Sequence, residues 1–444
     1  MALTLPAHRD PVTERVHASG LLQELSHAFG APFHFLLPER FEANLAAFRA
    51  VLTETAVPGK VYYAKKANKA AVFVERCAAT GAGVDVASHG ELREALAHGV
   101  RGEDLMVTGP AKADRLLLVA ALHGALIAVD SPDELDRVLE LAVPRPVRIL
   151  LRHRPSSQPG SRFGLDGEQL DAALRRCAAA GDRVRMEGFS FHLSGYAVQP
   201  RADLAGELTD RCAAARALGL PADRISIGGG FAVDYTAAGH WDAFLAEQSP
   251  EHYHAQKSFA EGDFYPYHSP TAGAGALRAI LAARPRGAGR SLAARLRAAG
   301  VTLLLEPGRA LLDRAGSSVF RVQGVKDRDG YGIVTVDGTS LSLSEQWFAS
   351  EFLPDPALLG PSPGTPYPAC VGGASCLDSD LLSWRKIAFP ARPRTGDLLV
   401  YPNTAGYQMD SNESPFHELP LPPKVVLDRT DQRPVWRLDR HGAS

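Results

Sequence analysis

Short apolar runs alternate with amphipathic stretches along most of the chain, from about residue 36 to residue 310. Stretches such as ERFEANLAAFRAVL and LDAALRRCAAAG carry apolar residues at helical spacing and end near glycine, which predicts helices. The runs between them suit buried parallel strands bounded by turns: VYYAKKA, VDVAS, LMVTG, LIAVD, VRILLR, MEGFSFHL, RISIGGG and VTLLLEPG. Eight strands interleaved with helices favour a (β/α)8 barrel of the TIM type over residues 36–310, with an open doubly wound sheet as the alternative.

The pattern changes after residue 310, where the helical periodicity fades. FRVQGVKD, YGIVTVDG, DLLVYPN and KVVLDRT have the character of strands between turns rich in glycine, proline and aspartate. We therefore expect a second, mostly β domain over residues 311–444, and we expect residues 1–35 to belong to it.

One segment, at about residues 236–298, departs from the alternation of predicted strands and helices. It is rich in aromatic residues and histidine, and it is too long for an ordinary barrel connection. Two interpretations stay open, an insertion over the mouth of an active site and an elaboration of the surface.

Composition narrows the class of protein. The chain has 444 residues, 45 % of them hydrophobic and 22 % charged, which suits a globular protein of two domains. A formal net charge of −2 gives no electrostatic reason to expect nucleic acid or an anionic membrane as partner. The N-terminus lacks the apolar core of a signal peptide, and the five scattered cysteines suit free thiols, so we expect a cytoplasmic location.

A pair of lysines follows the first apolar run. A strand period of two over residues 61–68 places Ala64, Lys66 and Asn68 on one face, and Lys65 on the other. A lysine that projects into a barrel needs a compensating partner, because burying an unpaired ammonium is costly. A Schiff base to an aldehyde cofactor would supply that partner. Strand-end lysines are more often solvated, however, and Lys65 is chemically equivalent, so the pattern alone leaves the choice open.

Other groups of chemical interest lie at the ends of later runs. Gly228–Gly230 would let the backbone approach a phosphate, although a plain tight turn is commoner. Glu306 closes the last run, on the catalytic face of a barrel, where it could keep a pyridine nitrogen protonated or simply pair with Arg309. His192 ends another run and Cys376 lies in the second domain. A structural histidine and a buried inert thiol are the simpler interpretations of these two.

Taken in order, these motifs resemble the fold-type III pyridoxal-phosphate decarboxylases, the ornithine, diaminopimelate and arginine decarboxylase group. The motif Y-A-x-K-A-N is matched at Tyr63–Asn68, which selects Lys66 over Lys65. GGGF and EPGR match directly, at Gly228–Phe231 and Glu306–Arg309. The other matches are GVDVASHGEL with Asp85 and Ser88, LLRHRP with Arg152, His192-Leu193-Ser194-Gly195 for H-x-G-S, Cys376-Leu377-Asp378-Ser379-Asp380 for C-[DE]-x-x-D, and Gly406-Tyr407. The resemblance spans roughly residues 31–410.

The resemblance implies a pyridoxal 5′-phosphate (PLP) enzyme that removes the α-carboxylate of an amino acid or amino-acid conjugate, through a Lys66 aldimine and a quinonoid intermediate. It also implies a head-to-tail homodimer with shared active sites, in which Cys376, Asp380 and Tyr407 reach into the partner's barrel. It assigns catalytic roles to Lys66, His192 and Cys376. It assigns cofactor contacts to Lys66, Asp85, Arg152, His192, Ser194, Gly228, Gly229, Gly230, Glu306, Arg309 and Tyr407, and substrate contacts to Cys376, Asp378 and Asp380.

Three departures from the family pattern bear on the substrate. Leu377 stands where an acid would read a distal amine of the substrate, and Ser194 is one position earlier than the family serine. The segment at 236–298 has no counterpart in simpler members. We therefore expect an unusual substrate, such as a conjugated or carrier-linked amino acid.

Three other functions remain as alternatives. A racemase or epimerase on the same fold would resemble its relatives in placing arginine at the pyridine nitrogen, where this chain has Glu306. A catalytically inactive binding protein would lack cofactor residues that are present here. A metal hydrolase could use His252, His254 and His268, but their spacing matches no familiar site, so no metal is expected.

Overall fold

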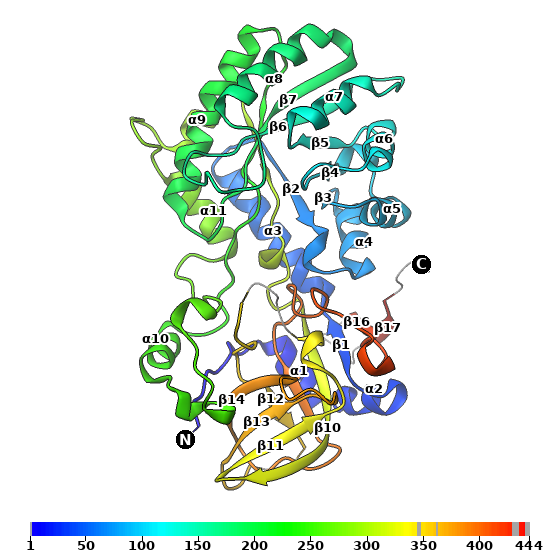
Figure 1. Cartoon of the computed structure of the whole chain (residues 1–444), viewed down its shortest axis with the longest axis vertical. Helices are drawn as coiled ribbons and strands as arrows, with labels where there is room; N and C mark the ends of the chain where they lie inside the picture. The colour runs from blue at the N-terminus through cyan, green and yellow to red at the C-terminus, as the bar shows by residue number, and fades with distance from the viewer. Residues whose placement is uncertain (1, 344–347, 361–362, 429–434, 440–444) are drawn as a thin grey trace.

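The computed structural model describes residues 2–343, 348–360, 363–428 and 435–439. It contains a closed barrel and a mostly β domain, which lie end to end along the long axis of the molecule (Figure 1).

The barrel consists of parallel strands in sequence order, and its last strand pairs with its first. The strands are β2 (Gly59–Ala64), β3 (Gly83–Val86), β4 (Leu105–Val107), β5 (Leu126–Val129), β6 (Val147–Arg152), β7 (Val184–Ser190), β8 (Arg224–Ser226) and β9 (Thr302–Leu305). Each of the predicted apolar runs overlaps one of these strands. The predicted barrel is therefore confirmed, and the open sheet is wrong.

Helices form the outer layer of the barrel (Figure 1). They are α3 (Pro38–Glu54), which precedes the first strand, and then α4 (Ala71–Thr80), α5 (His89–Ala97), α6 (Asp114–Leu122), α7 (Pro132–Glu140), α8 (Gly167–Ala180), α9 (Val198–Ala217), α11 (Gly273–Ala282) and α12 (Leu292–Ala298). Short polar side chains begin several of them. The Ser88 and Ser131 hydroxyls accept the amides of Glu91 and Glu134, and Asp166 forms a capping box with Gln169. These caps satisfy amides that the helix itself leaves unpaired.

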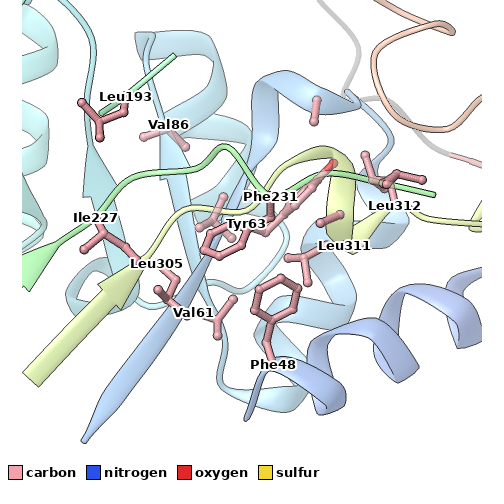
Figure 2. Close-up of a cluster of buried hydrophobic side chains, with 14 of the residues drawn as sticks. Phe48, Val61, Tyr63, Val86, Leu193, Ile227, Phe231, Leu305, Leu311 and Leu312 are labelled. Atoms are coloured by element: carbon pink, nitrogen blue, oxygen red, sulfur yellow. The ribbon is translucent and has the colours of Figure 1, made fainter. Parts of the chain in front are cut away.

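Apolar side chains fill the space between the strands and α3, as Figure 2 shows. Val61 and Tyr63 of β2 and Leu305 of β9 are fully or almost fully buried there. The rings of Phe48, on α3, and Phe231, after β8, meet edge to face with centroids 5.1 Å apart. Burial of one such side chain contributes about 1.5–3 kcal/mol. This packing fixes the carboxyl ends of β2, β8 and β9, which precede Lys66, the glycine turn and Glu306.

The second domain is built on a sheet that joins both ends of the chain. Strand β1 (Phe33–Leu36) pairs antiparallel with β10 (Gly316–Arg328) and parallel with β16 (Lys424–Asp428). Helices α1 (Pro11–Ala18) and α2 (Leu21–Phe29) pack apolar residues against it. The other strands are β11 (Tyr331–Val336), β12 (Ala357–Leu359), β13 (Tyr367–Gly372), β14 (Leu381–Phe389), β15 (Leu398–Tyr401) and β17 (Val435–Leu438). Strands β12, β13, β14 and β17 were not among the predicted ones.

The segment expected as an insertion at 236–298 is shorter than its predicted bounds. Helices α11 and α12 pack against α3 and α9, so they complete the helical layer between β8 and β9. The irregular part therefore ends near residue 272. It contains α10 (Ala238–Glu247), which lies beside the β domain in Figure 1, and it pairs with that domain through a bridge between Tyr253 and Arg385.

Candidate active site

A cavity of about 750 Å³ opens at the carboxyl ends of the barrel strands. Of the residues that the sequence singles out, those that line it are Lys66, Arg152, His192, Ser194, Gly229, Gly230, Glu306, Arg309 and Tyr407. Asp85 and Gly228 lie directly behind this wall. Asp85 accepts a hydrogen bond of 2.7 Å from Thr108, which lines the cavity, and Gly228 precedes Gly229. Residues far apart in sequence thus meet at one end of the barrel.

Lys66 reaches the cavity by a route that differs from the predicted one. Strand β2 ends at Ala64, and residues Lys65–Ala67 form a turn of 3-10 helix, so strand alternation does not apply to Lys66. The turn directs Lys66 into the cavity, whereas Lys65 is buried and its Nζ donates to the Lys69 carbonyl at 3.3 Å. Asn68, expected on the same face as Lys66, instead donates to the Ala405 carbonyl at 2.8 Å. The position of Lys66 is thus set by this turn and not by a strand face.

Acidic groups near Lys66 dominate the local electrostatics. Burial acts to lower the pKa of Lys66, but Tyr407, Asp85 and Glu306 outweigh it and raise that pKa. Burial and the charge of Glu306 raise the pKa of Asp85 to about 8, although Lys66 and the Thr108 hydroxyl oppose this. The Ser226 hydroxyl donates to Glu306 and holds it in the cavity wall. Asp85 is therefore largely protonated at neutral pH in the cofactor-free chain.

His192 and Arg152 occupy other parts of the wall. Desolvation deep in the barrel mouth, with the positive charges of Lys66, Arg152 and Arg201, lowers the pKa of His192, so its ring is neutral. Its Nδ1 accepts the Gly229 amide at 3.4 Å. Arg152 donates to Asp130 at 3.2 Å and lies over the ring of Phe163. A neutral aromatic ring and a fixed guanidinium thus border the cavity.

The glycine turn and the EPGR segment form a cradle at one end of the cavity. A Cβ on Gly229 would lie 2.8 Å from the Glu306 carbonyl oxygen, so only glycine allows these two segments to approach. Arg309 is buried, donates to the Gly406 carbonyl at 3.0 Å, and lies over the Tyr407 ring at 4.8 Å. A cationic side chain beside glycine amides is suited to a phosphate.

Tyr407 lies in the cavity of its own chain, which corrects the expectation that it reaches into a partner's barrel. Its amide donates to the Ala67 carbonyl at 2.8 Å, so the loop of the second domain is tied to the turn that carries Lys66. Its backbone φ of 76° is in the left-handed region, which few residues other than glycine adopt. The strained loop and this hydrogen bond together place the tyrosine beside Arg309.

The residues expected to contact substrate lie outside this cavity. Cys376 and Asp378 are exposed on the second domain, and the Cys376 sulfur is 3.2 Å from Nε2 of His417. Asp380 is buried, and its carboxylate accepts the amides of Ser340 and Ser375 at 2.7 and 3.1 Å. These two hydrogen bonds tie the Asp380 carboxylate to the backbone of its own domain, so it helps to hold this loop.

Several residues that line the cavity were not identified from the sequence. The aromatic side chains of Phe163, Tyr196, Tyr265 and Phe348 line the cavity, and the Tyr196 and Tyr265 hydroxyls are 2.7 Å apart. Tyr265 belongs to the irregular segment after β8, so that segment does contribute to the cavity wall. No motif marks these residues. Only their aromatic character, in loops that follow barrel strands, could have indicated them.

The three histidines considered for a metal hydrolase lie apart from one another. His252, His254 and His268 contact Ser249, Tyr331 and Asp234 respectively and are not gathered together. In the part of the chain that the structure describes, no group of three histidine, cysteine or acidic side chains is arranged to hold a metal ion. No described helix is both long and apolar enough to cross a membrane.

The comparisons agree with this geometry. Residues 39–257 match the family described as pyridoxal-dependent decarboxylase, pyridoxal binding domain. The chain is 41 % identical over 424 residues to the uncharacterized protein y4yA of Sinorhizobium fredii, covering 93 % of this chain and 92 % of that one. It is 27 % identical to the diaminopimelate decarboxylase of Deinococcus radiodurans, covering 94 % and 95 % of the two chains.

Solved structures share the architecture. The lysine/ornithine decarboxylase of Vibrio vulnificus, complexed with putrescine, superposes with a TM-score of 0.69 at 21 % identity over 92 % of this chain and 97 % of that one. The diaminopimelate decarboxylase of Helicobacter pylori, complexed with L-lysine, superposes with a TM-score of 0.71 at 18 % identity over 94 % of this chain and 96 % of that one. Membership implies PLP as the cofactor, and the lysine, the carboxylate and the glycine cradle described above fit it. The chain belongs to the fold-type III family of pyridoxal-phosphate-dependent decarboxylases.

Proposed function

We propose that this protein is a PLP-dependent decarboxylase that removes the α-carboxylate of an amino acid. One observation carries the proposal. Among the described residues that line the cavity there is one lysine, Lys66, and one carboxylate, Glu306, and these are the two groups that PLP decarboxylation needs. Bound PLP supplies an aldehyde that condenses with amines and a protonated ring that accepts the electron pair left by departing CO₂.

Each residue at the cavity would then have a separate role. The Lys66 amine would hold the cofactor until substrate displaces it. Glu306, which accepts a hydrogen bond from Ser226, would keep the ring nitrogen of the cofactor protonated. Asp85, behind Glu306, would be protonated while no cofactor is bound. The neutral His192 ring would cover one face of the cofactor. Gly229, Gly230, Arg309 and Tyr407 would bind its phosphate.

The cavity wall also constrains the substrate. Its carboxylate is Glu306, which we assign to the cofactor, and the rest of the wall is largely aromatic and apolar. Leu377, in the loop that carries Cys376, is half exposed and cannot pair with an ammonium. Within a single chain, a free distal amine would therefore find no countercharge in this wall other than Glu306. We propose a substrate whose side chain is apolar or has its distal amine blocked in a conjugate.

Protonation of the product carbon requires a donor, and Cys376 is our candidate. It does not line the cavity of its own chain. If it acts, it must come from a second copy, so we propose a homodimer in which the loop at 376–380 of each copy closes the cavity of the other. Asp378 is exposed on the same loop and would be free to contact the substrate there.

The test is the release of CO₂ by the PLP-loaded protein from a panel of D-, L- and Nω-conjugated amino acids, with product mass and chirality measured in parallel. We expect CO₂ and the matching decarboxylated amine from at least one apolar or conjugated member. Interconversion of enantiomers without CO₂ would contradict the proposal and favour the racemase. Absence of any cofactor absorbance after loading would favour the inactive binding protein.

A further inference from the structure

Arg201 is a buried cation with no anionic partner. It comes from the first turn of α9 and is 1 % exposed. Its Nη1 donates to the Ala197 carbonyl at 2.9 Å, and its Nη2 donates to the carbonyls of Leu193 and Gly195 at 3.0 and 2.6 Å. Within the described parts of the chain no carboxylate forms an ion pair with it, and its Nε has no hydrogen-bond partner. Burying a charge without a countercharge is costly, so a missing anion is expected nearby.

The location of this charge indicates where that anion would lie. A Cβ on Gly230 would be 2.0 Å from Nη2 of Arg201, so the guanidinium lies directly against the glycine turn. Gly230 has a φ of +77°, and it lines the cavity together with Ser194 and Tyr196. The guanidinium thus lies immediately behind the cavity wall, on the far side of Gly230.

Arg201 also orients a set of backbone amides. In a trans peptide the carbonyl and the following amide point in opposite directions. Because the carbonyls of residues 193, 195 and 197 face Arg201, the amides of Ser194, Tyr196 and Val198 point away from it. No backbone acceptor for these amides is found among the described residues. Val198 begins a helix of 20 residues, whose N-terminus adds a partial positive charge.

A buried arginine of purely structural use looks different in this same protein. Arg385 in the second domain is also 1 % exposed and donates to two carbonyls, those of Leu3 and Leu353. It has its own carboxylate, Asp355, at 2.8 Å. Arg201 has the carbonyls but lacks the carboxylate.

We propose that Arg201 is the buried countercharge and positioning residue of a phosphate-binding wall made by Gly230 and the amides of Ser194 and Tyr196, which line the cavity. The proposal rests on the proposed function, because the phosphate is that of bound PLP. Arg201 acts through the backbone that it holds and through its charge. Ser194, displaced by one position from its place in the family motif, makes such a backbone-based site more important here.

The test compares PLP with pyridoxal, which has the same ring and aldehyde but no phosphate. Their dissociation constants are measured by cofactor absorbance for the wild type, Arg201→Met and Arg201→Lys, with Arg385→Lys as the matched control. We expect Arg201→Met to weaken PLP binding roughly tenfold or more while pyridoxal binding stays within about twofold. Arg201→Lys should weaken PLP binding to an intermediate extent, because it keeps the charge but loses the planar guanidinium. Arg385→Lys should leave the ratio of the PLP and pyridoxal dissociation constants unchanged.

Equal weakening of both ligands, or of neither, would show a merely structural arginine and overturn the proposal. A second measurement covers variants that fail to fold. The ³¹P resonance of wild-type holoenzyme should stay at its dianion position down to about pH 5, below the ordinary second pKa of about 6 for a phosphate ester. A resonance that titrates near pH 6 would equally overturn the assignment. A wild type that binds no PLP at all would instead refute the proposed function.

Discussion

The barrel mouth and the loop at 376–380 are the two halves of the proposed site, and they are held in opposite ways. At the barrel mouth, Lys66 and Glu306 follow barrel strands and line a cavity within one chain. In the loop, Cys376 and Leu377 are exposed to solvent and contribute nothing to that cavity.

Under the proposed function, this difference separates cofactor binding from contact with the substrate. Everything proposed to hold the cofactor is present in a single chain, including Tyr407 from the second domain. The groups proposed to meet the substrate and its product lie on an exposed loop, and in the proposed homodimer they would complete the cavity of the other copy. Cofactor binding should therefore survive dissociation into single chains, whereas catalysis should not.

Within the barrel half, the largest difference in effect is expected between substitutions of the two adjacent lysines, Lys66 and Lys65. Lys66→Ala should reduce CO₂ release by at least about a thousandfold, because the amine that holds the cofactor is lost. It should also remove the absorbance of covalently held PLP. Lys65→Ala is the matched control, because Lys65 lies outside the cavity and donates to the Lys69 carbonyl. If Lys65→Ala abolished the absorbance instead, the assignment would be reversed.

Glu306→Gln should lower kcat by roughly a hundredfold, because an amide cannot balance the positive ring nitrogen although it can still accept from Ser226. Ser226→Ala is the control within the same contact and should cost less, about threefold to tenfold, since the carboxylate charge remains. Steady-state kinetics of CO₂ release measure both. Equal losses in the two variants would mean that position matters and charge does not.

Cys376→Ala tests the other half directly. It should slow product formation by about tenfold to a hundredfold and leave the dissociation constant of PLP unchanged, because a proton donor is lost and the barrel is untouched. Asp378→Ala, on the same exposed loop, is a control that should alter KM more than kcat.

Mixing Lys66→Ala with the impaired Cys376→Ala shows whether the site is shared. Dimers that exchange between Lys66→Ala and Cys376→Ala would contain one site with neither change, so the mixture should regain up to about a quarter of wild-type activity. No recovery after demonstrated exchange would contradict a shared site.

The sequence predicted the barrel well because its information is local. Each apolar run is bounded by turns, and the motifs around Gly228–Gly230 and Glu306 follow their strands directly. Strand alternation, which left the choice between Lys65 and Lys66 open, does not apply here, because the chain leaves the strand at Ala64 and a 3-10 turn carries Lys66 into the cavity. The family motif selected Lys66 without indicating this turn. That turn is fixed by the hydrogen bond between Tyr407 and Ala67, across 340 residues.

The missed features depend on similar long-range contacts. The sequence does not indicate that the Asp380 carboxylate accepts the amides of Ser340 and Ser375. Arg201 looks like one more charge on a helix until Gly230 is found against it. Strand β13 contains Pro368 and a register shift, which hide its alternation from a sequence pattern. In each case the deciding partner lies in another element of the fold.

The smallest effect concerns the pH dependence of stability in the barrel half before PLP binds. Burial and the charge of Glu306 raise the pKa of Asp85 to about 8 in the folded chain, against about 3.9 in an unfolded one. Because the folded state binds this proton more tightly, its contribution to stability is complete below about pH 4 and is lost as the pH rises towards 8. The cofactor-free protein should therefore lose at least about 1 kcal/mol of unfolding free energy between pH 5.5 and 8, measured in urea.

Asp85→Asn should remove that loss, because the amide has no proton to release, whereas Asp223→Asn, a half-exposed carboxylate outside the cavity, should retain it. PLP loading should also flatten the pH profile of the wild type, since a positive ring nitrogen compensates the second carboxylate charge. The loop at 376–380 has no such buried acid pair near a cavity, so Cys376→Ala should leave the profile unchanged. If Asp85→Asn kept the full pH dependence, another acid would have to release the proton. Asp85 would then not be the carboxyl whose charge the ring nitrogen of bound PLP compensates.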